Sequence, residues 1–225
     1  MKAFCSWSGG KDCCLALNRA LEKGYNVTHL ISMFDESGER SRSHAITKDL
    51  MQEQADSLGI ELLIVKSSWQ EYQIKFIEGI KTLQTFGCEY GIFGNIDEED
   101  YDGWLENIRN VTGIKTVIPL YNETRQSLIK EFFDKGFRSI VVCINGYYLS
   151  KSYCGREYNQ RFIQELPDEV DKCGENGEFH TFTFAGKCFK NRLNLKVKEV
   201  YNHKSNYSMG NAKVKEYYYA KLILN

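Results

Sequence analysis

Ser8-Gly9-Gly10-Lys11-Asp12 is the stretch that decides the fold, because it joins a strand candidate, Ala3–Trp7, to a helix candidate, Asp12–Lys23. Two glycines let the backbone approach a ligand closely, and the free N–H groups at the start of a helix attract an anion. Ser8 adds a hydroxyl group and Lys11 adds a positive charge. The stretch predicts a phosphate-binding loop, and an ordinary Gly-Gly turn with a solvated lysine is the alternative.

The loop differs from the common phosphate-binding patterns. A Walker A loop needs a glycine where this chain has Cys5, and it needs Ser or Thr after the lysine, where Asp12 stands. The G-x-G-x-x-G pattern of dinucleotide sites does not fit this stretch either. We therefore expect another class of nucleotide site.

Strand and helix candidates alternate through the first 144 residues. The strand candidates lie at 3–7, 27–34, 61–65, 91–94, 115–118 and 138–144, and the helix candidates lie at 12–23, 47–58, 68–86, 101–111 and 124–135. Such alternation predicts an α/β fold whose parallel sheet has helices on both faces. Ligands bind such sheets beyond the carboxyl ends of the strands, so we expect the site at the loops after Trp7, Phe34, Gly94 and Ile118.

The pattern changes after about Gly146, where Tyr and Gly become frequent and strand candidates lie at 178–184 and 193–201. We expect a smaller α+β region there. The chain is accordingly divided into a nucleotide-binding domain, 1–122, and a C-terminal substrate or catalytic region, 123–225.

Composition indicates a cytoplasmic globular protein without a membrane span or signal peptide. The 225 residues are 42% hydrophobic and 26% charged, and no apolar run approaches the roughly 20 residues of a spanning helix. Eight cysteines are scattered without a C-x-x-C pair, so we expect reduced, mostly buried cysteines and no protein-held metal site. The acidic run Asp97–Asp100 is interpreted as a solvated helix start.

The net charge of −1 hides a contrast between two parts of the chain. From Gly186 to the end there are nine Lys and Arg against two Asp and Glu, so this basic stretch carries +7 and residues 1–185 carry −8. The basic stretch is a candidate surface for a macromolecular acceptor or for a second copy of the chain in a homodimer. A lysine-rich sheet edge is the plainer alternative.

The loop after the first strand resembles the pyrophosphate (PP) loop of the ATP pyrophosphatases, which cleave ATP between the α and β phosphates to adenylate a substrate. Further family segments follow in order: Ser41–His44, Gln54-Ala55, Leu58–Ile60, Phe93–Ile96, Trp104–Glu106, Pro119–Tyr121, Arg125, Gly136-Phe137, Gly155-Arg156 and Cys173–Thr181. Together they resemble the diphthine–ammonia ligase family of N-type ATP pyrophosphatases, in the adenine nucleotide alpha hydrolase-like superfamily. The resemblance runs from about Phe4 to Phe189 and implies a Rossmann-like sheet of the HUP type.

The resemblance also implies a site. The residues expected at the nucleotide are Ser8, Gly9, Gly10, Lys11, Asp12, Cys13, His44, Gly94 and Asn95, and those expected to be catalytic are Lys11, Glu175, Glu178 and His180. ATP and Mg²⁺ are the implied cofactors. The family usually has Ser at the position of Cys13 and often has Asp at that of Asn95, and both departures bear on turnover.

The segment Cys173–Thr181 carries the acid and base candidates. In a strand 178–184, Glu178 and His180 share one face because side chains alternate. A carboxylate such as Glu175 or Glu178 is suited to bind ammonium and help deprotonate it. A solvated polar hairpin is the alternative interpretation of this segment.

The implied activity is an ATP-dependent amide ligase that adenylates a carboxylate, releases pyrophosphate and transfers ammonia. The implied acceptor is carboxylate-bearing and protein-borne: diphthine is a modified histidine of elongation factor 2 in archaea and eukaryotes, and a bacterial chain needs another acceptor. Two alternatives stay open. One is an RNA-modifying ATP pyrophosphatase that adenylates a tRNA base, a less favoured reading since thiolating members would want paired cysteines. The other is a non-catalytic module that binds ATP or AMP.

Overall fold

The computed structural model of the chain describes residues 1–97, 103–203 and 216–225. Glu98, Glu99 and Asp100 of the acidic run, the first two residues of the helix candidate 101–111, and residues 204–215 of the basic stretch lie outside this description. No helix in the described part of the chain is long and apolar enough to cross a membrane.

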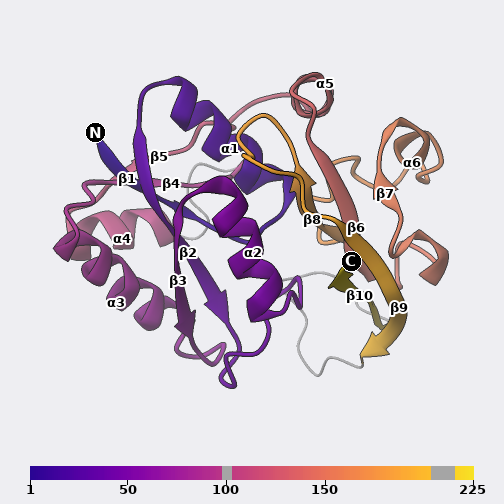
Figure 1. Cartoon of the computed structure of the whole chain (residues 1–225), viewed down its shortest axis with the longest axis horizontal. Coiled ribbons are helices and arrows are strands. Elements are labelled where there is room, and N and C mark those ends of the chain that lie inside the picture. The colour runs from indigo at the N-terminus through magenta and orange to yellow at the C-terminus, as the bar shows by residue number, and fades with distance from the viewer. Residues whose placement is uncertain (98–102, 204–215) are drawn as a thin grey trace.

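The first part of the chain forms the predicted parallel sheet (Figure 1). Its strands are β1 (Lys2–Ser6), β2 (Asn26–Phe34), β3 (Glu61–Lys66), β4 (Tyr90–Ile92) and β5 (Lys115–Val117). They lie in the order β3-β2-β1-β4-β5, and every neighbouring pair is parallel. The chain builds outward from β1 on one side and then crosses to the other side, so the gap between the ends of β1 and β4 is the switch point where such sheets bind ligands.

Helices cover both faces of this sheet, as predicted. The helices around this sheet are α1 (Lys11–Glu22), α2 (Lys48–Leu58), α3 (Tyr72–Thr85) and α4 (Trp104–Thr112). Two further helices, α5 (Arg125–Asp134) and α6 (Gln160–Gln164), follow β5 along the chain. Phe76 and Ile80 of α3 and Leu105 of α4 pack in one buried cluster with Phe4, whereas Leu17 of α1 and Met51 of α2 belong to the cluster on the other face. Figure 1 shows α3 and α4 opposite α1 and α2 across the sheet.

The helix ends follow the local sequence, with one shift. Gly59 ends α2 in the left-handed conformation (φ 69°), which glycine adopts without strain. The Oγ1 of Thr124 caps α5 by accepting a hydrogen bond from the Ser127 N–H. The Glu71 N–H donates to Oγ of Ser68 at 3.2 Å, as in a capping box, but the Glu71 carboxylate accepts from the Ser68 hydroxyl at 2.9 Å, and α3 begins only at Tyr72.

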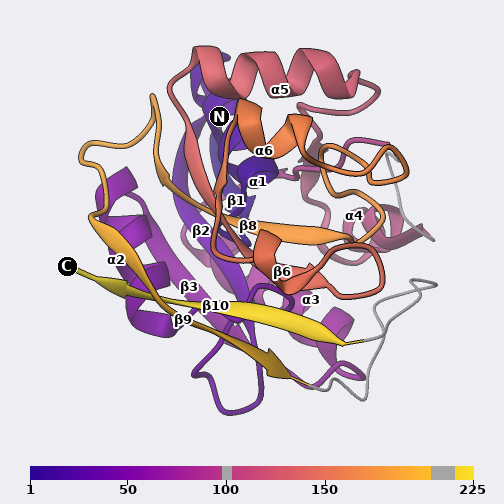
Figure 2. The ribbon, with the colours of Figure 1, turned by 90° about the vertical axis from the view of Figure 1, so that its right-hand side faces the viewer.

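A second, antiparallel sheet follows, as expected for the α+β region. It contains β6 (Arg138–Asn145), β7 (Glu157–Tyr158), β8 (Phe179–Ala185), β9 (Leu195–His203) and β10 (Tyr217–Leu224). Their order is β7-β6-β10-β9, and β8 also pairs with β6 (Figure 2). The strand candidate 138–144 therefore ends the alternating pattern but belongs to the second sheet, because its partners come from the last third of the chain. The pattern had not indicated β10.

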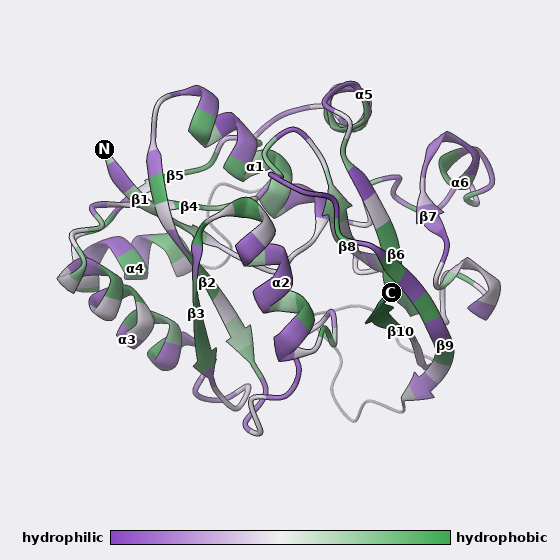
Figure 3. Ribbon diagram, in the orientation of Figure 1, coloured by the Kyte–Doolittle hydropathy of each residue, from purple (hydrophilic) through white to green (hydrophobic). Residues whose placement is uncertain are grey.

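The two sheets share one hydrophobic core. Val141 and Val142 of β6 and Phe182 of β8 lie in the same buried cluster as Cys14 and Leu17 of α1. Figure 3 shows hydrophobic residues concentrated along β2, β3 and β6. Because the cluster is continuous, β8 is held tightly against the start of α1, and this contact shapes the site.

The thiols are mostly buried, and charges from the two parts of the chain pair with each other. All eight cysteines are free thiols, and all but Cys188 are buried. Lys187 of the basic stretch pairs with Glu22 of α1 at 2.8 Å, so part of the charge contrast along the sequence is neutralised between the two parts of the chain.

Candidate functional site

The predicted phosphate loop lies at the switch point of the parallel sheet, between β1 and α1. Gly10 is the residue before the first turn of α1, so the amide groups at the start of this helix face the loop. Gly9 has a φ of 78°, and a Cβ there would lie 2.9 Å from Oε1 of Gln54 and 3.0 Å from the ring of Phe182. Glycine is therefore required at position 9 by both conformation and space.

The loop is held in place by residues far along the chain. The Lys11 N–H donates to Oγ1 of Thr181 at 3.0 Å, and the Thr183 N–H donates to the Gly9 carbonyl at 2.8 Å. The Gln54 side-chain amide also donates to that carbonyl, at 3.0 Å. Neither the threonines nor Gln54 had been assigned a role from the sequence, although Gln54 and Thr181 lie in segments that resemble the family. Two of these three hydrogen-bond partners, Thr181 and Thr183, belong to β8.

A cavity of about 290 Å³ opens beside this loop, beyond the carboxyl ends of β1, β2 and β4. It brings together half of the twelve predicted site residues. Those that line it are Ser8, Asp12, Cys13, His44, Gly94 and His180. Lys11, Glu175, Glu178, Gly9, Gly10 and Asn95 are not among its lining residues. A Cβ at Gly94 would lie 3.2 Å from backbone atoms of Asp12 and Cys13, so this glycine lets the loop after β4 pack on the start of α1.

Two other lining residues of the cavity are Ser32 and Arg42, although no role was predicted for them. Ser32 is 1% exposed, and its Oγ has no hydrogen-bond partner in the described part of the chain. The Arg42 guanidinium stacks 4.8 Å from the ring centre of Trp69, and its Nη2 donates to the Ser67 carbonyl. A serine inside the apolar strand 27–34 was the available signal for Ser32. A buried hydroxyl group without a partner suits a polar ligand in the cavity.

Cys13 occupies the position where a serine was expected. Its thiol donates to the Gly10 carbonyl at 3.2 Å and accepts from the Ser8 hydroxyl at 3.5 Å. Burial raises the pKa of this thiol. The hydrogen bonds with Cys14 and Ser8 together lower it by a larger amount, so the pKa lies below its ordinary value. Cys13 thus substitutes for a serine hydroxyl in the loop, as a weaker hydrogen-bonding group.

His44 and His180 form a pair of rings at the mouth of the loop, with centroids 4.7 Å apart. Nδ1 of His44 lies 2.9 Å from the Thr181 carbonyl, so Nδ1 carries the proton and donates. Burial lowers the pKa of His44 to about 4 and that of His180 well below its usual value. Both rings are therefore neutral near pH 7, and they are suited to hydrogen bonding rather than to carrying a positive charge.

The loop that carries His44 is strained. Ser43 and Ala45, on either side of it, have φ angles of 66° and 53°, in the left-handed region that residues with a Cβ rarely adopt. Strained backbone of this kind is concentrated at functional sites. It directs the His44 ring toward Gly10 and β8.

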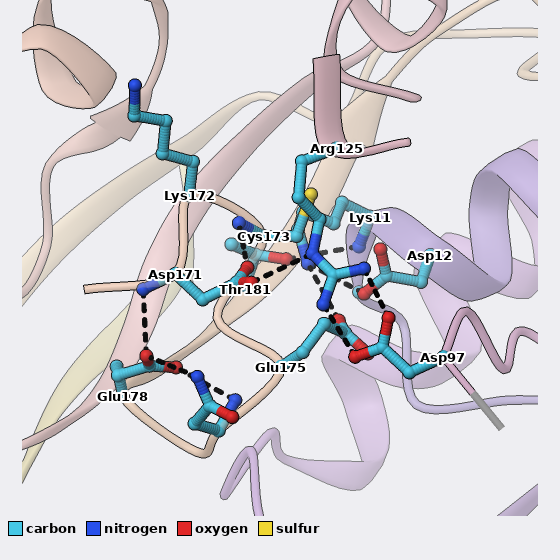
Figure 4. A network of polar contacts seen from close by, with 12 residues as sticks. Lys11, Asp12, Asp97, Arg125, Asp171, Lys172, Cys173, Glu175, Glu178 and Thr181 are labelled. Atoms are coloured by element: carbon cyan, nitrogen blue, oxygen red, sulfur yellow. Dashed lines mark hydrogen bonds and ion pairs between the residues drawn. The ribbon is translucent and has the colours of Figure 1, made fainter. Parts of the chain in front are cut away.

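Lys11, Asp12 and Glu175 form the charged centre of the site (Figure 4). Nζ of Lys11 lies 2.7 Å from Oδ2 of Asp12 and 3.9 Å from Oε1 of Glu175, and Lys11 is only 6% exposed. Burial lowers the pKa of Lys11, but Asp12, Cys173 and Glu175 raise it by more, so its amine is protonated. Burial, together with Asp12, raises the pKa of Glu175 to about 7, although Lys11 opposes the rise.

Glu175 and Glu178 lie in the loop of residues 171–178 that precedes β8, here called the acidic loop. Glu178 is fully buried and accepts three hydrogen bonds, from the Asp171 N–H at 2.8 Å, the Asn176 N–H at 3.0 Å and the Asn176 side chain at 3.1 Å. The expected shared face with His180 is wrong, because β8 begins only at Phe179 and the Glu178 carboxylate is turned into its own loop. The contacts of Glu178 are those of a residue that shapes the loop.

Arg125 ties the acidic loop to the parallel sheet. Its guanidinium contacts Asp97 at 2.5 and 2.6 Å and Asp171 at 2.8 Å (Figure 4). The hydrogen bonds from Arg125 lower the pKa of Asp97. Asp97, interpreted as part of a solvated helix start, is thus an ion-pair partner instead. Asn95 is half-buried in the same loop after β4.

We find no metal site formed by protein side chains alone in residues 1–97, 103–203 and 216–225. These ranges contain no group of three or more His, Cys, Asp or Glu side chains that could hold an ion. A metal ion that arrives with a nucleotide needs only one or two carboxylates, since phosphate oxygens supply other ligands. Asp12 and Glu175 fit that lesser requirement.

Two family descriptions match the chain. The diphthamide synthase N-terminal domain matches residues 1–116, and the diphthamide synthase C-terminal domain matches residues 124–218. The described site draws on both, since the phosphate loop lies in the first and the acidic loop and β8 lie in the second.

Curated relatives and a solved structure are also similar to the chain. A diphthine–ammonia ligase of Schizosaccharomyces pombe is 22% identical over 91% of this chain but only 38% of the relative. A diphthine–ammonia ligase of Danio rerio is 23% identical over 87% of both proteins. A 4-thiouridine synthetase in complex with RNA and ATP is 15% identical, with a TM-score of 0.41 over 59% of this chain and 40% of that one. That structural match is too distant to carry an argument about this chain.

Proposed function

Because the chain belongs to the diphthamide synthase family, we propose that it is an ATP-dependent amide ligase of the diphthine–ammonia ligase type. In the first step, an acceptor carboxylate oxygen attacks the α phosphorus of ATP, and pyrophosphate leaves. In the second step, ammonia attacks the carbonyl carbon of the acyl-adenylate, AMP leaves with the bond electrons, and the nitrogen loses a proton to give the amide.

The observation that carries this proposal is the meeting of Lys11 with Glu175 at the start of α1. A buried, protonated amine lies 3.9 Å from a carboxyl group whose pKa is raised to about 7, and the same amine lies 2.7 Å from Asp12, which lines the 290 Å³ cavity at the start of α1. An amine and helix N–H groups stabilise phosphate charge. A carboxyl group with a pKa near 7 exchanges protons readily at neutral pH. Adenylation and ammonia transfer need these two kinds of group side by side.

Lys11 and the loop amides hold the phosphates of ATP in this mechanism. The N–H of Lys11 itself is engaged by Thr181, so its contribution is the side-chain charge. Mg²⁺, when bound with ATP, neutralises charge on the phosphates, and Asp12 and Glu175 are the carboxylates that would face it. Ser8, Cys13, His44 and Ser32 line the cavity where the remainder of the nucleotide binds.

Glu175 handles the ammonia. Ammonia is mostly ammonium near neutral pH, and a carboxylate beside the acyl-adenylate binds that cation and accepts its proton. Glu178 supports this role indirectly, because its three hydrogen bonds fix the loop that carries Glu175. His180 stays a catalytic prediction, and its neutral ring serves as a hydrogen-bonding group.

The acceptor is a carboxylate on a protein, with diphthine as the reference substrate. Residues 1–122 bind the nucleotide in this proposal, while residues 123–225 supply Glu175, brace the phosphate loop through β8 and meet the acceptor. The chain spans 38% of the length of the S. pombe relative, so functions that reside in the remainder of that protein are not transferred.

The test is a turnover assay with purified protein, ATP, Mg²⁺, an ammonium salt and elongation factor 2 that carries diphthine. AMP and pyrophosphate are measured together with the mass of the acceptor peptide. The proposal expects AMP and amide in equal amounts, dependent on ammonia. A panel of other protein-borne carboxylates replaces diphthine if the source is bacterial. ATP binding without AMP release for any carboxylate would favour a non-catalytic module, and tRNA-dependent AMP release would favour RNA modification.

A further inference from the structure

Three hollows follow one another across the molecule, and each shares a lining residue with the next. The nucleotide cavity shares Asp12 with a void of about 10 Å³ that lies between α1, α5 and the acidic loop. This void, here called the neck, shares Ile129 with a surface groove of about 590 Å³ between α5 and α6. The three hollows therefore lie next to one another between the outer side of α5 and the phosphate loop.

The neck is narrow and mostly apolar. Its walls are Leu15 of α1 with Leu128, Ile129 and Phe132 of α5, and its inner end carries Lys11, Asp12, Tyr158 and Cys173. All of these residues except Asp12 and Ile129 are buried. A volume of about 10 Å³ holds a single water-sized molecule. Neither a nucleotide nor a carboxylate on a protein side chain passes through such an opening, whereas ammonia is the size of water.

The walls of the neck also discriminate by charge. An apolar wall strongly disfavours an ion relative to a neutral molecule of the same size. The two charged residues of the neck, Lys11 and Asp12, are ion-paired with each other at 2.7 Å. In the outer groove Lys130 is ion-paired with Asp134, and Figure 4 shows the Lys172 side chain directed away from the charged centre. The apolar wall therefore favours passage of neutral ammonia over ammonium, and on this route Glu175 accepts the proton that the nitrogen loses after it attacks the acyl carbon.

We propose that the groove between α5 and α6 is the entrance for ammonia and that the neck is its passage to Lys11, Asp12 and the acyl group. The proposal rests on the proposed function, because it assigns a route to the second substrate of that reaction. ATP and the acceptor reach the nucleotide cavity, on the other side of the neck. Ammonia then reaches the acyl-adenylate without the acceptor having to move aside.

The first experiment closes the neck with Ile129→Trp and uses Gln126→Trp as the matched control. Ile129 lines both the groove and the neck, whereas Gln126 is exposed and lines the groove only. We expect Ile129→Trp to raise the KM for ammonium salt about tenfold or more, as expected when a small hydrophobic passage is filled, while the KM for ATP stays within about twofold. Gln126→Trp should change neither. An unchanged ammonia KM in folded Ile129→Trp would overturn the passage, and Ile129→Phe is the second variant if the first does not fold.

Widening the neck gives the opposite effect. Leu128→Ala removes three carbon atoms from its wall, and we expect this variant to accept methylamine with a kcat/KM about tenfold closer to that for ammonia than in the wild type. An unchanged preference between the two amines would count against the passage.

A crystal structure separates failure of the passage from failure of the proposed function. We expect one water-sized density peak in the neck of the wild type and none in Ile129→Trp, whatever the turnover. A wild-type neck closed at high resolution would overturn the passage even if the enzyme is active. An open neck in a protein that makes no AMP would refute the proposed function and leave the opening itself established.

Discussion

The phosphate loop and the acidic loop meet at the same site, but they are stabilised in opposite ways. The phosphate loop depends on outside contacts: Thr183 and Gln54 donate to the Gly9 carbonyl, and the Lys11 N–H donates to Thr181. The acidic loop is held mainly from within, since the Glu178 carboxylate accepts hydrogen bonds from the backbone of Asp171 and Asn176, and Arg125 adds an ion pair from outside through Asp171. The phosphate loop is thus shaped mainly by distant elements of the fold, and the acidic loop is shaped mainly by its own buried Glu178 carboxylate.

The difference separates two glutamates that look alike in the sequence. Glu178 is fully buried with its hydrogen bonds made, whereas Glu175 faces Lys11 and has a pKa raised to about 7. A carboxylate with every partner supplied by its own loop is suited to a structural role. One held beside charged groups with a shifted pKa is suited to chemistry.

The largest expected effect tests the phosphate loop. Lys11→Met removes the positive charge next to the phosphates but keeps the backbone N–H that Thr181 accepts. We expect the rate of AMP formation to fall about 10³-fold, as when a charge-stabilising group is removed from an active site, with the fold retained. The assay is AMP release at saturating ammonia, with circular dichroism to check folding. A rate within tenfold of the wild type would contradict the assigned role.

The next effect tests the chemical side of the acidic loop. Glu175→Gln keeps the shape of the side chain and removes the group that binds and deprotonates ammonium. We expect ammonia-dependent amide formation to fall about 10²-fold, the usual contribution of an acid–base group, with no fall in melting temperature, because the amide removes a carboxylate whose ionisation opposes folding. Normal turnover in this variant would eliminate the role of Glu175.

Glu178→Gln tests the structural side of the same loop. An amide places an NH₂ group where the carboxylate accepted N–H donors, so one buried donor loses its partner. We expect the free energy of unfolding to fall by about 1–3 kcal/mol, which lowers the melting temperature by several degrees. Thermal melting measures this change beside Glu175→Gln as the matched control. If Glu178→Gln melts like the wild type and Glu175→Gln melts at a lower temperature, then Glu175, and not Glu178, stabilises the acidic loop.

The smallest expected effect is a pH dependence of stability. Burial and Asp12 raise the pKa of Glu175 from 4.5 to about 7, so the folded state holds this proton more tightly than the unfolded state. Protonation of Glu175 therefore stabilises the fold fully below about pH 4.5, and this contribution is lost as the pH rises to about 7. Denaturant unfolding at several pH values should show a smaller fall in stability across this range for Glu175→Gln. Identical pH profiles for both proteins would refute the raised pKa.

Local patterns were sufficient for the parallel sheet and for the position of the phosphate loop. The alternation of strands and helices and the glycines at 9 and 10 are signals between near neighbours in the sequence, and the structure has both features. The pairing of β6 with β8 and β10 could not be read in the same way, because those partners lie 34 or more residues away and any antiparallel strand with apolar residues would fit.

The resemblance in motifs nominates the candidate site residues, while their arrangement depends on the fold. A resemblance in motifs gathers Glu175, Glu178 and His180 into one segment, yet only the fold determines where β8 begins and which way each side chain turns. Ser32 and Gln54 were missed because a single polar residue in an apolar strand or helix is usually a satisfied core residue. Their contacts with the cavity and with Gly9 depend on packing between distant elements.

The most direct test of the central claim is a crystal structure of the wild-type protein with a non-hydrolysable ATP analogue and Mg²⁺. The account predicts phosphates on the loop Ser8–Asp12, with the α phosphate beside Nζ of Lys11 and with Glu178 still bonded to the backbone of its own loop. Phosphates bound away from Lys11, or an acidic loop rearranged so that Glu178 replaces Glu175 beside Lys11, would contradict it.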